Sequence, residues 1–312
     1  MDFKRLGYFA QVAELGSLSR ASDRTGIAQP SLSRQMRLLE EELGVTLFRR
    51  APRGMQLTEA GEVLYARIAG PMREIGHAIY EVRSLPSDAG GSVAIGMPPT
   101  IIQMLAGPLA RRAAAYSPNI ALRIVDAYSG HLVDWMHQGE LDMAILYGPT
   151  PGGLNANKLL DDELMLVGPA NSPLVSESAV DCRRLGELPL ILPSGSHGLR
   201  VLLEAAASKA GAKLDVRIQA DSYQLMKELV ESGLGYTALP HCAFAREAAA
   251  GRLTFARLRK PTVIRQLFLA MRAGAEAPRA VLQVENLVRT EVAGLVQQGV
   301  WTVSKLYRVG DN

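Results

Sequence analysis

The pattern of apolar and polar positions is clearest between residues 28 and 44, where apolar residues recur at the spacing of one helical face. The stripe consists of Leu32, Met36, Leu39 and Leu43. Pro30 suits the first turn of a helix, and Gly44 is well placed to end it. The pattern therefore predicts a short amphipathic helix in this stretch.

The polar face of this predicted helix is unevenly charged. Three glutamates occupy the last turn, and the first half carries a cluster of amide, hydroxyl and guanidinium side chains: Gln29, Ser31, Ser33, Arg34 and Arg37. Acidic residues at a helix C-terminus oppose the helix dipole, so helix stability does not explain this layout. Such polar groups can instead reach phosphates and base edges, and arginine pairs with guanine. A DNA-reading helix is favoured, although a solvated surface helix is the commoner interpretation of such a segment taken alone.

Two shorter helices are predicted before this one. Apolar residues share one face between residues 3 and 13, and Gly16 ends that segment before Ser17, a good N-cap for a second helix. Thr25 and Gly26 break the second helix. A helix, a turn containing glycine and a helix with a polar N-terminal face form the helix-turn-helix arrangement, and three helices make a minimal core.

A β-hairpin is predicted directly after the third helix. Two short extended runs between residues 45 and 58 flank a turn signal at residues 52–54, and Arg49, Arg50 and Arg53 lie at or beside its tip. An ordinary basic hairpin is the alternative. Next to a helix-turn-helix, however, a wing that contacts the DNA backbone or minor groove is favoured.

A long helix is predicted to follow the hairpin. Thr58 can cap its N-terminus. Apolar residues then keep one stripe until about Leu85: Val63, Leu64, Ile68, Met72, Ile75, Ile79 and Val82. This stripe has no evident partner within the small N-terminal module. The pattern therefore predicts a dimerising linker helix followed by a hinge.

From Ser92 onward, short apolar strands alternate with helices in two successive sets, which predicts a mostly parallel α/β sheet. Residues 164–167 and 267–271 are candidates for two strands that carry the chain between the sets. Residues 278–298 are predicted to form a closing helix.

Composition adds one asymmetry to this pattern. The 312-residue chain has a net charge of +3, and residues 1–57 hold nine Lys/Arg and six Asp/Glu, so the whole excess lies there. That fits a small basic module joined to a neutral one. Cys182 and Cys242 are too few for a disulfide framework and lack metal-ligand spacing. Residues 89–110 carry no charge, but prolines interrupt this run, so it is not expected to span a membrane. No signal-peptide pattern is present either, and we therefore expect a cytoplasmic protein.

One segment closely resembles the N-terminal domain of LysR-type transcriptional regulators: GSLSRASDRTGIAQPSLSRQMRLLEEELGVTLFRR, followed by RGMQLTEAG and a long helix. The resemblance covers about the first 85 residues. It implies wing positions for Arg50 and Arg53, and DNA-reading positions for Gln29, Pro30, Ser31, Ser33 and Arg34. Ala28 occupies a place where serine is frequent in the family, which weakens the expected cap of the reading helix. Residues 96–100 and 129–131 further resemble the branch that contains nitrogen-assimilation control proteins.

The resemblance also implies an architecture: an α/β protein with an N-terminal winged helix-turn-helix, a long linker helix and a two-lobed effector domain similar to periplasmic binding proteins. We predict residues 1–58 as the winged helix-turn-helix, 59–91 as linker helix and hinge, and 92–300 as the effector domain. Lobe I would comprise 92–163 and 268–300, and lobe II 164–267. The tail, 301–312, has no clear pattern.

Several predicted strands end in turns that carry hydroxyl groups. Ligands of parallel α/β sheets collect at the carboxyl ends of strands, where free amides of helix N-termini attract anions. If the lobes face one another as the resemblance implies, a small anionic effector, with carboxylates the first candidates, would bind among Thr100, Ser129, Tyr147, Ser196 and His197. Each hydroxyl taken alone is more often a helix cap. His131 and His197 are equally consistent with solvated loop histidines.

We therefore predict a sequence-specific transcriptional regulator, an activator, a repressor or both, that a small metabolite controls. Two DNA-reading domains related by two-fold symmetry match a palindromic operator, so we expect a homodimer formed through the linker helix. The family resemblance further implies a homotetramer. RNA polymerase is another candidate partner.

Two other functions are the alternatives. An enzyme is disfavoured because GxSxG, Walker, HExxH and opening GxGxxG motifs are absent, and neither a cofactor nor a metal is expected. A pure solute-binding protein would leave the first 85 residues without a role.

Overall fold

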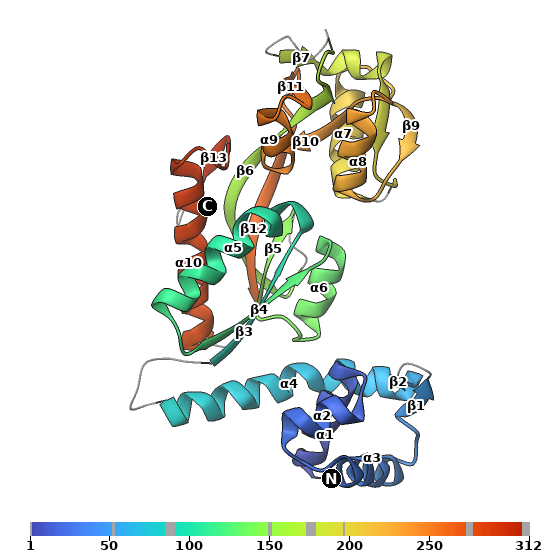
Figure 1. Ribbon diagram of the computed structural model, residues 1–312, viewed down its shortest axis with the longest axis vertical. Helices are drawn as coiled ribbons and strands as arrows, with labels where there is room; N and C mark the ends of the chain where they lie inside the picture. The colour runs from blue at the N-terminus through green and yellow to red at the C-terminus, as the bar shows by residue number, and fades with distance from the viewer. Residues whose placement is uncertain are drawn as a thin grey trace.

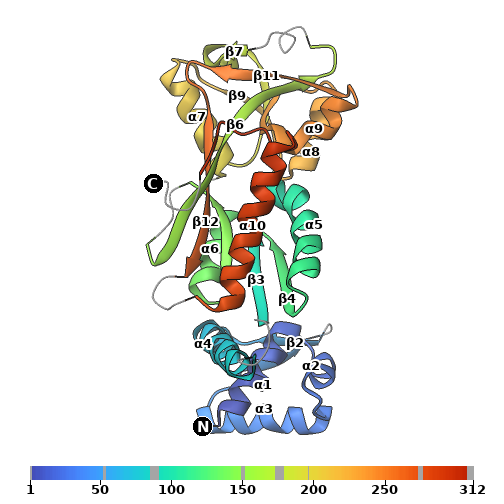
Figure 2. The same cartoon turned by 90° about the vertical axis from the view of Figure 1, so that its left-hand side faces the viewer.

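The computed structural model describes residues 2–51, 54–84, 91–148, 152–172, 179–195, 197–272 and 277–307. Three parts are stacked along its longest axis, a helical head at one end and then two α/β lobes (Figures 1 and 2). Helix α4 (Glu59–Ser84) lies between the head and the first lobe. This arrangement confirms the predicted helix-turn-helix head, linker helix and two-lobed α/β domain.

Three helices form the head: α1 (Phe3–Leu15), α2 (Leu18–Thr25) and α3 (Gln29–Leu43). They close on a buried core that includes Phe9, Val12, Leu32, Met36 and Leu39. Three of the four predicted stripe positions of α3 are thus core residues, and Leu43 packs against the core as a partly buried residue. Each helix ends at a glycine with positive φ, a conformation in which the terminal amide bonds back to the last turn.

The predicted wing consists of β1 (Phe48–Ala51) and β2 (Gly54–Leu57), which pair antiparallel. Thr58 caps α4 as predicted, because its Oγ1 accepts a hydrogen bond from the Gly61 amide at 3.1 Å. A carboxylate of α3 also supports the start of the wing: Glu40 Oε1 accepts hydrogen bonds from the Leu47 and Phe48 amides at 2.7 and 3.1 Å.

The apolar stripe of α4 divides between two environments. Leu64 and Ile68 pack against the head core, whereas Val63, Ile75 and Ile79 are exposed. The prediction that the whole stripe lacks a partner in the N-terminal module is therefore wrong for Leu64 and Ile68, on the part of α4 that meets the head. The exposed residues leave an apolar surface that no described residue covers.

Lobe I contains part of a nine-stranded sheet, with its strands in the order β4-β3-β5-β12-β6. These strands are β3 (Gly91–Met97), β4 (Ile120–Asp126), β5 (Met143–Tyr147), β6 (Leu154–Pro169) and β12 (Ile264–Arg272). Helices α5 (Pro99–Tyr116) and α10 (Arg279–Gln297) share one core cluster with this sheet, and α6 (Ser129–His137) packs in another. The sheet thus carries helices on both sides (Figure 1).

Lobe II is built on the far half of β6. That half pairs with β10 (Thr237–Pro240) and β11 (Leu253–Arg259), and β11 pairs with β7 (Ala179–Asp181). A separate parallel pair consists of β8 (Pro189–Leu192) and β9 (Asp215–Gln219). A 3-10 helix, Cys182–Glu187, and three α-helices complete the lobe: α7 (Gly198–Lys209), α8 (Tyr223–Glu231) and α9 (His241–Ala249).

Two antiparallel strands, β6 and β12, connect the lobes. Residues 154–163 of β6 pair with β12, and residues 164–169 pair with the lobe II strands β10 and β11. The predicted crossover segments, 164–167 and 267–271, therefore lie inside strands that are considerably longer.

The segment after α10 packs onto this crossover, although its sequence shows no pattern. Trp301 is 1% exposed, and β13 (Lys305–Leu306) pairs with β6. The Tyr307 hydroxyl donates a hydrogen bond to Asp161 Oδ2 at 2.9 Å. The tail is thus part of the fold as far as residue 307.

Neither a membrane span nor a metal cluster is found in the described ranges. None of their helices is both long and apolar enough to cross a bilayer. No group of three or more His, Cys, Asp and Glu side chains gathers there, and both cysteines are free thiols.

Candidate DNA-reading and effector sites

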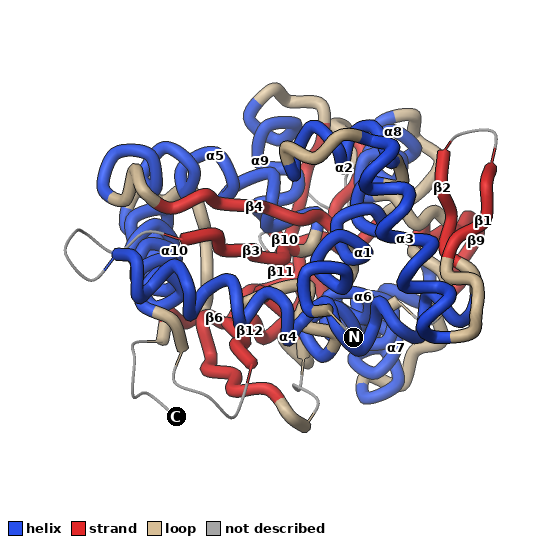
Figure 3. Tube along the Cα trace, turned by 90° about the horizontal axis from the view of Figure 1, so that it is seen from below, coloured by secondary structure: helices blue, strands red, loops and turns tan. Residues whose placement is uncertain are grey.

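Helix α3 lies at the end of the molecule farthest from lobe II, on its outer face (Figures 2 and 3). The structure places most of the predicted reading residues on this surface: Gln29, Pro30, Ser31, Arg34 and Arg37 are exposed, and Ser33 is half-buried. Gln29 is oriented by Ser19, whose hydroxyl donates a hydrogen bond to its Oε1 at 3.2 Å.

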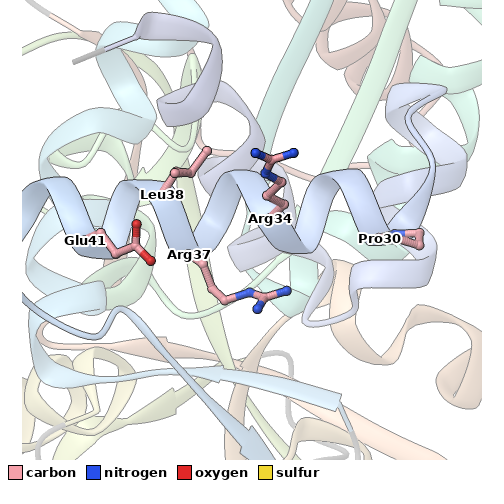
Figure 4. Close-up of a pocket in the computed structure, with 5 residues that line it drawn as sticks. All are labelled: Pro30, Arg34, Arg37, Leu38 and Glu41. Atoms are coloured by element: carbon pink, nitrogen blue, oxygen red, sulfur yellow. The ribbon is translucent and has the colours of Figure 1, made fainter.

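The two arginines of α3 extend into solvent around an open hollow. Pro30, Arg34, Arg37, Leu38 and Glu41 line this hollow, as Figure 4 shows. Ala28 makes no side-chain cap at the helix start, which confirms the weak cap that its sequence predicts. The first-turn amides of α3 therefore receive no capping group from the side chain of residue 28.

The acidic end of α3 has a role that the sequence interpretation missed. Glu40 accepts the two wing amides described above, and Glu42 Oε2 pairs with Arg5 Nη1 at 2.9 Å. Two of the three glutamates are thus held by neighbours within the head. The third, Glu41, is exposed at the rim of the hollow.

The wing is described only in part. Arg49 is exposed on β1. Arg50 belongs to the same strand, but its side chain and the whole of Arg53 lie outside the described residues.

Three predicted effector residues meet at the carboxyl edge of the lobe I sheet. Thr100 lies in the first turn of α5, Ser129 begins α6, and Tyr147 ends β5. The Tyr147 hydroxyl is hydrogen-bonded to the Thr100 hydroxyl, and the Tyr147 amide donates to Ser129 Oγ at 3.2 Å. One cluster therefore joins the ends of three elements.

Lobe II approaches this cluster through His197. The His197 ring lies edge-on to the rings of Tyr128 and Tyr223, with centroids 5.3 and 6.0 Å apart. Tyr128 bridges the lobes, since its hydroxyl donates a hydrogen bond to the Asp221 carbonyl oxygen. Ser196, the fifth predicted residue, lies outside the described residues.

The centre of the cluster is Arg265, which the sequence analysis missed. Its side chain is 2% exposed; Nη2 donates to Asp162 Oδ2 at 2.7 Å, and Nη1 donates to Thr100 Oγ1 at 3.4 Å. The guanidinium carbon lies 4.1 Å from the centroid of the Tyr147 ring. The sequence carried no clear signal for it, since Arg265 and Arg272 both flank the apolar run 267–271 and nothing in the run shows which of the two is buried.

Burial sets the protonation of these groups. Burial opposes charge on Arg265, but Tyr147 and Asp162 keep its pKa above the usual range, so it remains a cation. Burial raises the pKa of the Asp162 carboxyl and that of the Tyr147 hydroxyl, and it raises the pKa of Tyr223 to about 12. The cluster therefore combines one paired cation with neutral hydroxyl groups.

His197 predicts a pH dependence of stability. Its Nδ1 accepts a hydrogen bond from the Leu199 amide at 3.2 Å and so caps α7, while burial lowers its pKa below 6.5. The contribution of His197 to stability is therefore complete above that pH and declines as the pH falls through the folded-state pKa. We expect His197→Asn, which can still cap, to lose less stability than the wild type on acidification, by about 1 kcal/mol.

Thermal unfolding on either side of pH 6.5 measures this difference. Burial also lowers the pKa of His241, but that residue titrates in both proteins, so its contribution cancels. Equal losses in the two proteins would contradict the capping role of the neutral ring.

Comparison with known proteins covers both parts of the chain. Residues 3–62 match the family described as "Bacterial regulatory helix-turn-helix protein, lysR family", and residues 86–293 match "LysR substrate binding domain". HTH-type transcriptional regulator BbuR of Bordetella bronchiseptica is 32% identical, over 96% of this chain and 93% of that protein. Nitrogen assimilation regulatory protein nac of Escherichia coli is 29% identical, over 96% and 97%.

Solved structures show the same fold. A full-length variant of OxyR from Pseudomonas aeruginosa is 23% identical with a TM-score of 0.74, and 94% of each chain is covered. Full-length CbnR in complex with its target DNA is 20% identical with a TM-score of 0.67, over 93% of this chain and all of that one. At these identities the likeness concerns the fold alone.

Proposed function

The chain belongs to the LysR family of DNA-binding transcriptional regulators, and on that premise we propose that it reads DNA with the exposed face of α3. Gln29, Ser31 and Ser33 would contact base edges and phosphates, Arg34 and Arg37 would pair with guanine or phosphate, and Pro30 would fix the first turn at the groove. One observation carries this assignment: Arg34 and Arg37 extend from α3 without an ion pair among the described residues, while Glu40 and Glu42 beside them are held within the head.

The wing is proposed as the second DNA contact. Arg50 and Arg53 would reach the backbone or the minor groove, where cationic side chains release counterions and make affinity depend on salt. Arg49, which is exposed on the same strand, adds a further cation to the hairpin.

For the effector we propose a small anion, with carboxylates as the first candidates. Thr100, Ser129 and Tyr147 would hold it from lobe I, and Ser196 and His197 from lobe II. The N-termini of α5 and α6 favour negative charge, and the Arg265 cation lies at the centre of the same cluster. An anion would therefore meet hydroxyl donors and one guanidinium.

The assembly we propose is a homodimer through α4 and a homotetramer through further contacts. Exposed Val63, Ile75 and Ile79 support a partner along α4, because three large apolar side chains on one helix are costly to leave in water. The two heads of such a dimer would bind a palindromic operator. The bound protein would act as an activator, a repressor or both, with RNA polymerase as a further partner. We infer no catalytic role, since the functions proposed for the head and for the cluster are both binding functions.

Selection of DNA from sheared genomic fragments tests the DNA-reading function. The purified protein should enrich fragments that share one inverted repeat, with half-sites separated by about one helical turn or a multiple of it. Uniform retention of all fragments at physiological salt would refute sequence-specific binding.

A thermal-shift screen with small carboxylates tests the effector site, because a ligand at 100 times its Kd stabilises the fold by about 2.7 kcal/mol. With any carboxylate that shifts the wild type, Ser129→Ala and Thr100→Ala should weaken binding roughly five- to tenfold through a lost hydrogen bond. Ser232→Ala, at the exposed C-terminus of α8, is the control and should respond normally. Undiminished responses in both lobe I variants would place the effector elsewhere.

A further inference from the structure

We propose that α6 is a rigid connector that transmits movement of the effector cluster to the linker helix through a contact between Gly139 and Gly70. The effector end of this inference rests on the proposed function. The contact with α4 does not, because it is a packing of one backbone on another. In Figures 1 and 2, α6 stands over α4, between that helix and lobe II.

The two glycines meet where the turn after α6 reaches α4. Both residues are buried. A Cβ on Gly70 would lie 3.1 Å from the Gln138 carbonyl oxygen and 3.2 Å from Gly139 Cα, and a Cβ on Gly139 would collide with Gly70. A side chain at residue 139 is therefore excluded, and one at residue 70 would require its neighbours to move by a few tenths of an ångström.

The opposite end of α6 lies in the effector cluster. Ser129, its first residue, accepts the Tyr147 amide, and Tyr128 immediately before it donates to the lobe II residue Asp221. A change in the distance between the lobes would therefore pull directly on the start of α6.

The body of α6 is suited to carry such a displacement. It has nine residues, so it spans about 13 Å at 1.5 Å per residue. Leu132 and Met136 are fully buried against the lobe I sheet. A short helix that is packed along its length moves as a unit, and α6 links its two ends without a hinge.

A second tie holds the head on lobe I. Arg123 on β4 lies 3.9 Å from Glu14 on α1, and Glu14 also pairs with Arg24 at 3.3 Å. The guanidinium of Arg272 on β12 lies beside both glycines. The head, α4 and lobe I are thus joined at more than one point, so a displacement of α6 together with lobe I would carry α4 and the head with it.

The substitution Gly70→Ala tests the contact, and Gly76→Ala on the same helix is its matched control. Both changes improve helix propensity equally, but a Cβ on Gly76 meets nothing within 4 Å. The readout is hydrogen exchange of the Gly139, Glu140 and Leu141 amides, which donate to α6 carbonyls, in the full-length protein without effector. We expect exchange there to be about tenfold faster in Gly70→Ala and unchanged in Gly76→Ala.

If the two variants have the same oligomeric state by light scattering and these amides exchange at equal rates in both, the proposed contact between Gly139 and Gly70 is contradicted. If the contact exists, the effector response of Gly70→Ala should be reduced while the carboxylate identified by thermal shift still binds; a full response would overturn the transmission. Failure of the proposed effector site looks different, because Ser129→Ala would then bind and respond normally while Gly70→Ala still exchanged faster.

Discussion

Replacing Arg34 and Ser33 together by alanine is expected to abolish sequence-specific DNA binding at physiological salt and to leave the fold intact. Arg34 is exposed on the outer face of α3, and Ser33 is half-buried beside it. One good contact to a base edge is worth about 1–3 kcal/mol, so two lost contacts weaken specific binding by about 100-fold or more. Neither side chain contributes to the head core, to which α3 supplies Leu32, Met36 and Leu39.

Fluorescence anisotropy with a fragment obtained by genomic selection measures this loss. Arg217→Ala is the charge-matched control, because it removes one exposed cation from lobe II. At one fixed salt concentration it should bind as the wild type does, since long-range attraction is screened beyond about 10 Å. If the double variant bound the fragment within about threefold of the wild type, α3 would not be the reading helix.

The head was predictable because its signals are local. Apolar spacing defined the buried face of α3, and glycines 16, 26 and 44 marked three helix ends that the structure places in the left-handed conformation. The role of Glu40 was not predictable in the same way. Its hydrogen bonds join residues seven and eight positions away across a change from helix to strand, and no periodicity records such a link.

Only part of the effector cluster could be predicted from the sequence. Turns after strands identified Thr100, Ser129 and Tyr147, since every parallel strand delivers its end to the same edge of the sheet. Arg265 and Asp162 are 103 residues apart and meet only because the pairing of β6 and β12 places them directly opposite each other. Register depends on the whole sheet, so the pair could not be inferred from either strand alone.

The tail illustrates the same point. Trp301 lies in the lobe I core, and Tyr307 bonds to Asp161 on β6. Neither residue belongs to a periodic segment, because this short segment is held by a two-residue strand and a few single side chains. Asp162 and Arg265 lie on the two strands that connect the lobes and the tail packs onto them, so side-chain contacts constrain this crossover in addition to strand pairing.

That constraint predicts a large loss of stability for Asp162→Asn. The substitution leaves the Arg265 cation 2% exposed without its carboxylate, and breaking a buried ion pair on one side costs about 3–5 kcal/mol. In a domain of this size, thermal unfolding should shift downward on the order of 10 °C. Asp215→Asn is the matched control: its partner Arg217 lies 2.6 Å away with both side chains well exposed, and such pairs are worth about 0–1 kcal/mol.

Removing both charges distinguishes the destabilisation caused by an unpaired buried cation from the net stability that the ion pair contributes. Asp162→Leu combined with Arg265→Met should recover most of the stability that Asp162→Asn loses, because an apolar pair of similar volume often replaces a buried ion pair without net cost. The double variant should nevertheless lose the response to a carboxylate, since the central cation of the cluster is gone. All proteins must be compared at one concentration, because oligomerisation adds to apparent stability. If Asp162→Asn unfolded within about 2 °C of Asp215→Asn, Arg265 would not depend on this carboxylate, and the crossover would be held together by its apolar contacts alone.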